Sequence, residues 1–126
     1  MQMLIAVAAG GAVGAVGRYL VMSQVGHWLG ASFPYGTLAV NVAGSFLLGA
    51  LVEIMALVWS TSQEMRAFLV VGVLGAFTTF SAFSLDAVAL FERGAVGAVA
   101  LYIAASVFLA VAGLVAGLAL FRLLLA

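Results

Sequence analysis

Four long apolar segments make up most of this chain, and they restrict it to a fold that can cross a membrane. The segments cover residues 3–22, 35–58, 66–91 and 95–121. Each has the roughly 20 residues that a helix needs to span the hydrocarbon core. Charged residues make up only 6% of the sequence, against about 25% in soluble domains. The sequence therefore predicts one all-α integral membrane domain over residues 1–126, with the lipid bilayer as its solvent.

The composition also excludes several classes of function. With four arginines, no lysine and a net charge of zero, the chain offers no basic surface for nucleic acid. It has no cysteine, and its one histidine, His27, falls in the connection expected at residues 23–34, which leaves a zinc or iron site without ligands. No nucleophile–base pair is visible, so we do not expect an enzyme. The N-terminus lacks the positive region of a cleaved signal peptide.

The arginines give the chain no preferred orientation in the membrane. Four spans place both termini and the connection at residues 59–64 on one side with Arg66 and Arg122, and Arg18 and Arg93 on the other. Orientation normally follows an excess of Lys and Arg on the cytoplasmic side, and here neither side has one. Either a weaker signal sets the orientation, or the chain inserts both ways and pairs as an antiparallel dual-topology homodimer.

The third segment contains a sequence that an ordinary membrane helix avoids. Residues 72–86 read GVLGAFTTFSAFSLD, and steps of about 100° per residue would spread the four hydroxyls around a regular helix. Gly72 and Gly75 precede the hydroxyls, where the backbone can bend or break. Irregular backbone at membrane depth must be buried in protein or line a cavity. We therefore predict that the third helix breaks mid-membrane, near residues 75–79, and that the break is the functional centre.

Polar and small residues in the other segments each allow two interpretations. The Asn41 amide either holds the bundle together through an interhelical hydrogen bond or faces a pore. Tyr102 and Ser106 place two hydroxyls one turn apart, although Ser106 taken alone most simply bonds back to its own helix. Glycines with small-residue spacing allow close helix packing, within one subunit or between two: Gly10, Gly14 and Gly17 in the first segment, Gly113 and Gly117 in the fourth.

The charged residues lie near the ends of the predicted spans. Arg18 is expected to extend toward the membrane interface. Asp86 is expected to pair with Arg18 or Arg93, and Glu53 to reach water or pair with Arg66. No carboxylate occupies the middle of a span. Since a proton-coupled transporter needs a titratable group on its path, this absence favours passive conduction.

Three motifs together resemble the Fluc/CrcB family of small fluoride channels. They are GRY at residues 17–19, GTLAVNVAGSFLLG at residues 36–49 and GVLGAFTTFSAFS at residues 72–84. The resemblance extends over essentially the whole chain. It implies a multi-pass channel of the inner (plasma) membrane that passively exports cytoplasmic fluoride and so lowers its toxicity. It also implies an antiparallel homodimer with a structural sodium ion, Na+, at the centre of its interface.

The same resemblance implies roles for individual residues. Backbone carbonyls of Gly75 and Thr78 from both subunits would bind the sodium ion, and Arg18 would belong to a vestibule. The fluoride pore would be lined by Asn41, Phe80, Phe83, Tyr102 and Ser106, with weaker assignments for Thr37, Thr79, Ser81 and Ser84. Two positions depart from the family. Ala82 stands where threonine is frequent, and Ala110 stands where a hydroxyl often continues the polar track, which is expected to slow conduction.

Two other functions remain open from the sequence. A small dual-topology multidrug or cation exporter has the same size and number of spans. It would need a carboxylate in the first span, however, and residues 3–22 contain none. A purely structural or lipid-binding subunit would leave the hydroxyl cluster and Asn41 unexplained.

Dual topology can be tested by changing the balance of positive charge between the two membrane sides. Adding two or three lysines to one side of the chain should force a single orientation, because positive charge is retained in the cytoplasm. If the functional unit is an antiparallel pair, fluoride efflux should then be lost. Labelling of the two ends of the chain checks that only one orientation is present. Undiminished efflux from such a protein would exclude dual topology.

Overall fold

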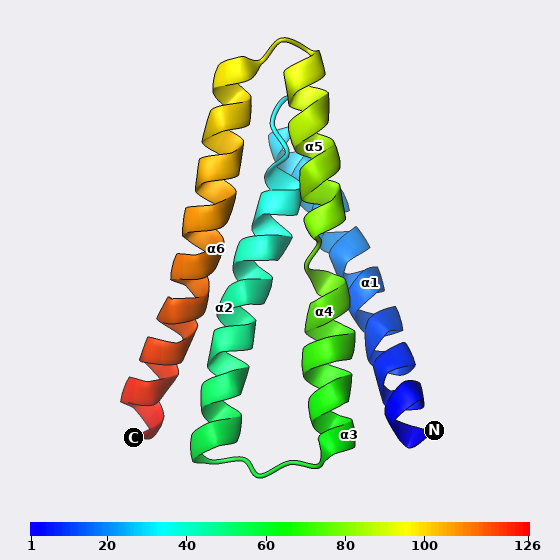
Figure 1. The fold of residues 1–126 in the computed structure, drawn as a ribbon, viewed down its shortest axis with the longest axis vertical. Helices are drawn as coiled ribbons and strands as arrows, with labels where there is room; N and C mark the ends of the chain where they lie inside the picture. Colours follow the sequence, from blue (N-terminus) through cyan, green and yellow to red (C-terminus); the bar gives the residue numbers. More distant parts are fainter.

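The computed structural model describes residues 1–126, and every regular element in it is a helix. Four helical spans are long and apolar enough to cross a membrane, and both termini lie at the same end as the connection between the second and third (Figure 1). The predicted all-α fold with four spans is therefore confirmed. The spans are α1 (Gln2–Leu29), α2 (Tyr35–Leu57), a composite third span (Gln63–Glu92) and α6 (Val96–Leu125).

The first helix runs past its predicted end at residue 22. It continues to Leu29 and ends at Gly30, whose φ of 82° lies in the left-handed region that favours glycine. At 1.5 Å per residue the helix is about 42 Å long, which exceeds the roughly 30 Å of the hydrocarbon core. The loss of hydropathy after residue 22 therefore marks the end of the apolar segment and not of the helix. The expectation of a loop at His27 is wrong, because this residue lies in the last turn of α1.

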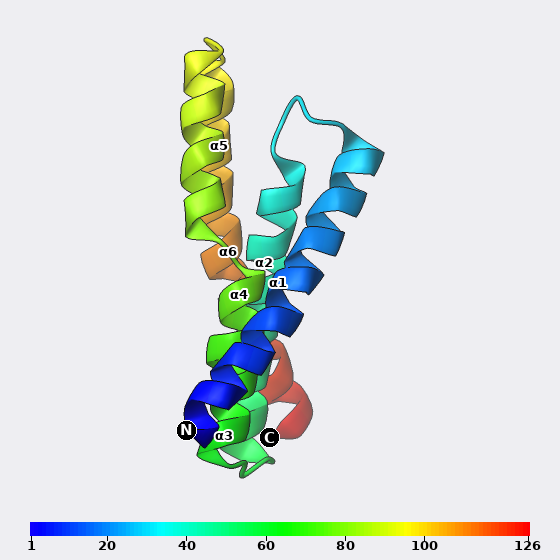
Figure 2. The same cartoon turned by 90° about the vertical axis from the view of Figure 1, so that its right-hand side faces the viewer.

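The third span is assembled from pieces of different geometry (Figure 2). Its first half includes a π-helix, in which the Gly75 N–H bonds to the Val70 carbonyl five residues back. The helix is then interrupted within the predicted window, because Thr78 (φ −86°, ψ 157°) and Thr79 (φ −151°, ψ 116°) have extended backbones. The elements are α3 (Gln63–Arg66), the π-helix η1 (Ala67–Leu74), α4 (Gly75–Phe77) and α5 (Phe80–Glu92).

Glycines allow the helices to pack in two close pairs. A Cβ at Gly14 of α1 would overlap the carbonyl oxygen of Val73 in η1, and one at Gly117 of α6 would overlap the carbonyl oxygen of Phe46 in α2. The glycines in these two helices therefore allow close packing within one subunit, which was one of the two interpretations of their spacing. The pairs meet mainly along α1 and α2, whereas α2 touches η1 only lightly. A groove remains between α2 and the third span.

Two charged side chains have partners other than those expected. Glu53 is buried and pairs with Arg122 instead of Arg66, with 2.9 Å between Oε1 and Nη2. This ion pair joins the ends of α2 and α6. Arg18 lies well inside α1, and its Nε donates to the Ala76 carbonyl at 3.0 Å.

The position of Arg18 changes the interpretation of the arginines. Its guanidinium lies at the C-terminal end of the helical run that stops at Phe77, where the last carbonyls carry partial negative charge. Arg18 therefore does not extend to the membrane interface, and it does not count among the arginines that set orientation. Arg66 and Arg122 remain at one end of the bundle and Arg93 at the other. The two ends therefore still differ little in their number of arginines.

The contact between α1 and η1 predicts different effects for two neighbouring glycines. Gly14→Ala should lower the free energy of unfolding by about 1–3 kcal/mol, because the added methyl group meets backbone. Gly11→Ala is the matched control, since nothing lies within 4 Å of its Cβ position. Thermal unfolding in detergent micelles measures both. Equal midpoints for the two variants would contradict this packing.

Candidate functional site

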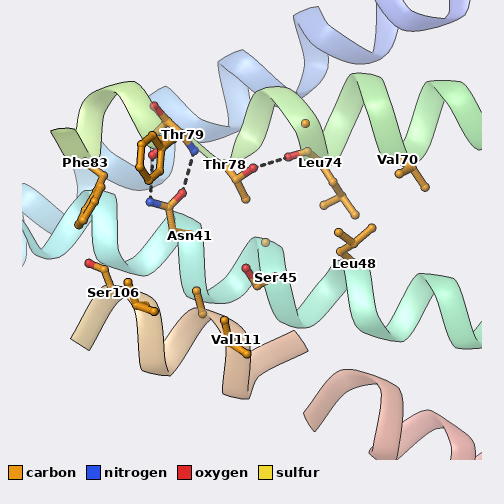
Figure 3. Close-up of a pocket in the computed structure, with 15 residues that line it drawn as sticks. Asn41, Ser45, Leu48, Val70, Leu74, Thr78, Thr79, Phe83, Ser106 and Val111 are labelled. Atoms are coloured by element: carbon orange, nitrogen blue, oxygen red, sulfur yellow. Dashed lines mark hydrogen bonds between the residues drawn. The ribbon is translucent and has the colours of Figure 1, made fainter. Parts of the chain in front are cut away.

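A cavity of about 400 Å³ occupies the groove between α2, the third span and α6 (Figure 3). None of the fifteen residues in its wall is charged. The interruption of the third span forms one side, and α6 contributes Ser106 and Ala110 to the other. The cavity brings together seven residues that the sequence assigned to a site: Asn41, Gly75, Thr78, Thr79, Phe80, Phe83 and Ser106.

The side chain of Asn41 joins α2 to the interruption through two hydrogen bonds to a single residue. The Thr79 N–H donates to Asn41 Oδ1 at 2.7 Å, and Asn41 Nδ2 donates to the Thr79 carbonyl at 3.0 Å (Figure 3). This observation confirms the first interpretation of Asn41, in which its amide holds the bundle together through interhelical hydrogen bonds. A carboxamide has two N–H donors, so one remains for another acceptor. Its role in a pore stays a prediction.

The two threonine hydroxyls stabilise the ends of the interrupted helix. The Thr78 hydroxyl donates to the Leu74 carbonyl at 3.0 Å, and the Thr79 hydroxyl accepts from the Ala82 N–H at 3.1 Å as the N-cap of α5. In a continuous helix the Thr79 N–H would bond to the Gly75 carbonyl. Because this N–H donates to Asn41 instead, the Gly75 carbonyl has lost its usual helical partner.

The aromatic pair lies at the mouth of the same cavity. The ring centroids of Phe80 and Phe83 are 5.3 Å apart, which confirms that the two side chains point in similar directions. Phe83 also lies 5.2 Å from the ring of Tyr102. Phe80 is 78% exposed, so this chain alone does not cover it. Ser81 and Ser84 are also exposed, and Ser84 donates back to the Phe80 carbonyl at 3.0 Å.

Ser106 carries the one buried side-chain polar atom without a partner. Its hydroxyl was expected to bond back to its own helix, but it makes no hydrogen bond and is only 7% exposed. A buried hydroxyl without a partner costs about 1–3 kcal/mol, so it is retained where a ligand or water satisfies it. Ser106 is one of the residues that line the cavity, and its hydroxyl is a donor without a partner in this chain.

Tyr102 belongs to a separate polar cluster that sequence reasoning missed. Its ring is fully buried, and its hydroxyl donates to Asp86 Oδ2 at 3.0 Å. Thr37 donates to the same carboxylate oxygen at 2.6 Å. Asp86 therefore pairs with neither Arg18 nor Arg93, whose Nη2 donates to the Ser32 carbonyl. These partners are far apart in the sequence, so no local pattern predicts the cluster.

Comparison with known proteins gives a consistent result. Residues 5–118 match the protein-family model described as CrcB-like protein, Camphor Resistance (CrcB). A protein named fluoride-specific ion channel FluC from Rhodospirillum centenum is 60% identical over 122 residues, which is 97% of each chain. The FluC of Agrobacterium fabrum is 60% identical over 92% of this chain and 93% of its own length, and that of Nitrobacter winogradskyi 50% identical over 96% of each.

These relatives are ion channels by name, not enzymes, and they match 97% and 92% of this chain. The four apolar spans agree with a multi-pass protein of the inner membrane. On this match and on the motifs of its second and third spans, the chain belongs to the CrcB family of fluoride-channel proteins.

Proposed function

We propose that this chain forms a fluoride-selective channel that passively exports cytoplasmic fluoride and so lowers its toxicity. The observation that carries the proposal is a cavity with no charged side chain in its wall, which is lined by residues with unpaired hydrogen-bond donors, above all Ser106. The names of the relatives supply the identity of the ion. The exporter considered from the sequence has no such support, because α1 contains no carboxylate.

The chemistry of the cavity suits a small anion that holds its water tightly. Transfer of an ion from water to a low-dielectric interior costs several kcal/mol unless donors replace the lost water. The Ser106 hydroxyl and the free N–H of Asn41 would act as such donors. The ring edges of Phe80 and Phe83 are electropositive and would face the anion without a formal charge. Uncharged donors bind weakly enough to release the ion, as conduction requires.

The exposed face of the interruption favours a second copy of the chain. Gly75, Phe80 and Ser81 are all exposed beside the break, and the Gly75 carbonyl lacks its helical partner. Polar backbone in contact with lipid costs several kcal/mol per group, so a protein surface must cover it. A second copy of opposite orientation would do so, because it presents the same face. The functional unit in this proposal is therefore an antiparallel dual-topology homodimer.

The freed carbonyls at the interruption fit a sodium ion. Main-chain carbonyl oxygens are ligands that hard cations prefer, and Gly75 and Thr78 of each copy would supply them. When bound, the ion would supply positive potential near the cavity without placing a fixed cation in its wall. Arg18, which donates to the Ala76 carbonyl, would add positive charge on the vestibule side of the same break.

The remaining site residues would define the ends of the path. Tyr102 and Thr37 share the Asp86 carboxylate, so their hydroxyls would serve an anion only after leaving it. On the other side, Ala110 lies in the cavity wall and offers no hydroxyl beyond Ser106. The row of donors on α6 therefore stops at Ser106, and slower conduction stays a prediction.

The aromatic pair gives the sharpest test of this proposal. Phe80→Ile and Phe83→Ile should each lower fluoride efflux from proteoliposomes by about tenfold or more, because an aliphatic side chain has no electropositive edge. A tenfold loss corresponds to a barrier that is higher by about 1.4 kcal/mol. The matched control is Phe91→Ile, an exposed phenylalanine of α5 outside the cavity, which should conduct normally. Unaltered efflux in both cavity variants would remove the aromatic role.

A further inference from the structure

The interrupted segment of the third span is held from outside its own helix. Thr79 is extended, and an extended residue directs its N–H and its carbonyl to the same side. The carboxamide of Asn41 presents an acceptor and a donor to that side, and both are used, at 2.7 Å and 3.0 Å. One side chain therefore pairs with Thr79 as a neighbouring strand residue would. It satisfies the Thr79 N–H, which the interruption removes from the helix, and adds a hydrogen bond to the Thr79 carbonyl, which as N-cap also begins α5.

Gly44, one turn along α2, provides space for the preceding residue. A Cβ at Gly44 would overlap Cγ2 of Thr78 and lie 3.2 Å from Cδ2 of Phe77. Residues three apart share a helix face, so Asn41 and Gly44 meet Thr79 and Thr78 in turn. The surface of α2 thus matches the two extended residues one by one.

We propose that Asn41 and Gly44 are positioning residues for the interruption. We call the two hydrogen bonds from Asn41 to Thr79 the Asn41 clamp. By holding the Thr79 N–H, the clamp keeps it from the Gly75 carbonyl and leaves the Thr79 hydroxyl to cap α5 through the Ala82 N–H. The effect on ion flux rests on the proposed function, whereas the effect on the backbone does not.

Threonine resonances report the clamp directly. The chain contains four threonines, so selective ¹⁵N and ¹³C labelling of the full-length protein in lipid nanodiscs gives a spectrum simple enough to assign. In Asn41→Leu the Thr79 N–H must turn to water or to the Gly75 carbonyl. The first outcome speeds its hydrogen exchange by about tenfold or more, and the second moves its ¹³C shifts from extended to helical values. Either supports the clamp.

Ser45→Ala is the matched control for this measurement. Ser45 lies on the same helix and in the same cavity but makes no hydrogen bond to the interruption, so the Thr79 signals should stay as in the wild type. Gly44→Ala should shift Thr78 more than Thr79. Unchanged exchange and unchanged shifts of Thr79 in Asn41→Leu would overturn the inference.

A second variant separates the clamp from simple filling of space. In Asn41→Asp, a protonated carboxyl offers one acceptor and one donor, as the clamp needs, whereas the ionised form has no donor. The Thr79 signals should therefore approach those of the wild type as the pH falls from about 8 to about 3, a range that includes the ordinary aspartate pKa of about 3.9. The wild type at each pH corrects for the other titratable groups on the surrounding helices: Arg18, Asp86 and Tyr102. A pH-independent disturbance would contradict the clamp.

Fluoride efflux from proteoliposomes that contain the same variants keeps the two proposals apart. If the clamp and the channel are both correct, Asn41→Leu disturbs Thr79 and lowers efflux by about tenfold or more. A wild type that does not conduct fluoride would refute the channel and leave the Thr79 result standing. Normal efflux with an undisturbed Thr79 in Asn41→Leu would refute the clamp and leave the channel standing.

Discussion

The structure depends on the rule that no backbone polar group can face lipid without a partner. An interrupted helix breaks that rule unless neighbouring groups replace its hydrogen bonds. Here the replacements come from three sources: the amide of Asn41 for Thr79, the Thr79 hydroxyl for the start of α5, and the guanidinium of Arg18 for Ala76. The Gly75 carbonyl is left out of this exchange, and Gly75 is exposed, which is why we propose a second copy and a sodium ion at this face.

Charge is kept out of the cavity by pairing it elsewhere. Glu53 is neutralised by Arg122 at one end of the bundle, and Asp86 accepts hydrogen bonds from Thr37 and Tyr102 toward the other. The cavity wall then holds no charged side chain and consists of uncharged polar groups, aromatic rings and aliphatic side chains. A fixed arginine or lysine in this place would bind an anion too strongly for rapid release, and a carboxylate would repel it. In the proposed channel, the unpaired hydroxyl of Ser106 would supply a donor of the intermediate strength that conduction needs.

Two local signals predicted the main features of the fold, because each can be read from neighbouring residues. Hydropathy predicted the four spans, and the cluster of glycines and hydroxyls at residues 72–86 predicted the interruption. The pairing of Phe80 with Phe83 followed from helical spacing in the same way. The end of α1 did not follow, since Gly30 and not the loss of hydropathy ends that helix. The Glu53–Arg122 and Thr37–Asp86 contacts join residues 69 and 49 positions apart, so they depend on helix packing that the sequence does not display. The π-helix η1 has no recognised sequence signal either.

The central claim is that uncharged donors in this cavity conduct fluoride and reject larger halides. Its most direct test is efflux from proteoliposomes that contain the wild-type protein, followed in parallel with fluoride- and chloride-selective electrodes while a potassium ionophore balances the charge. A channel lined by uncharged donors should release fluoride rapidly and retain chloride at the level of protein-free vesicles. Chloride released as readily as fluoride, or neither ion released, would contradict it.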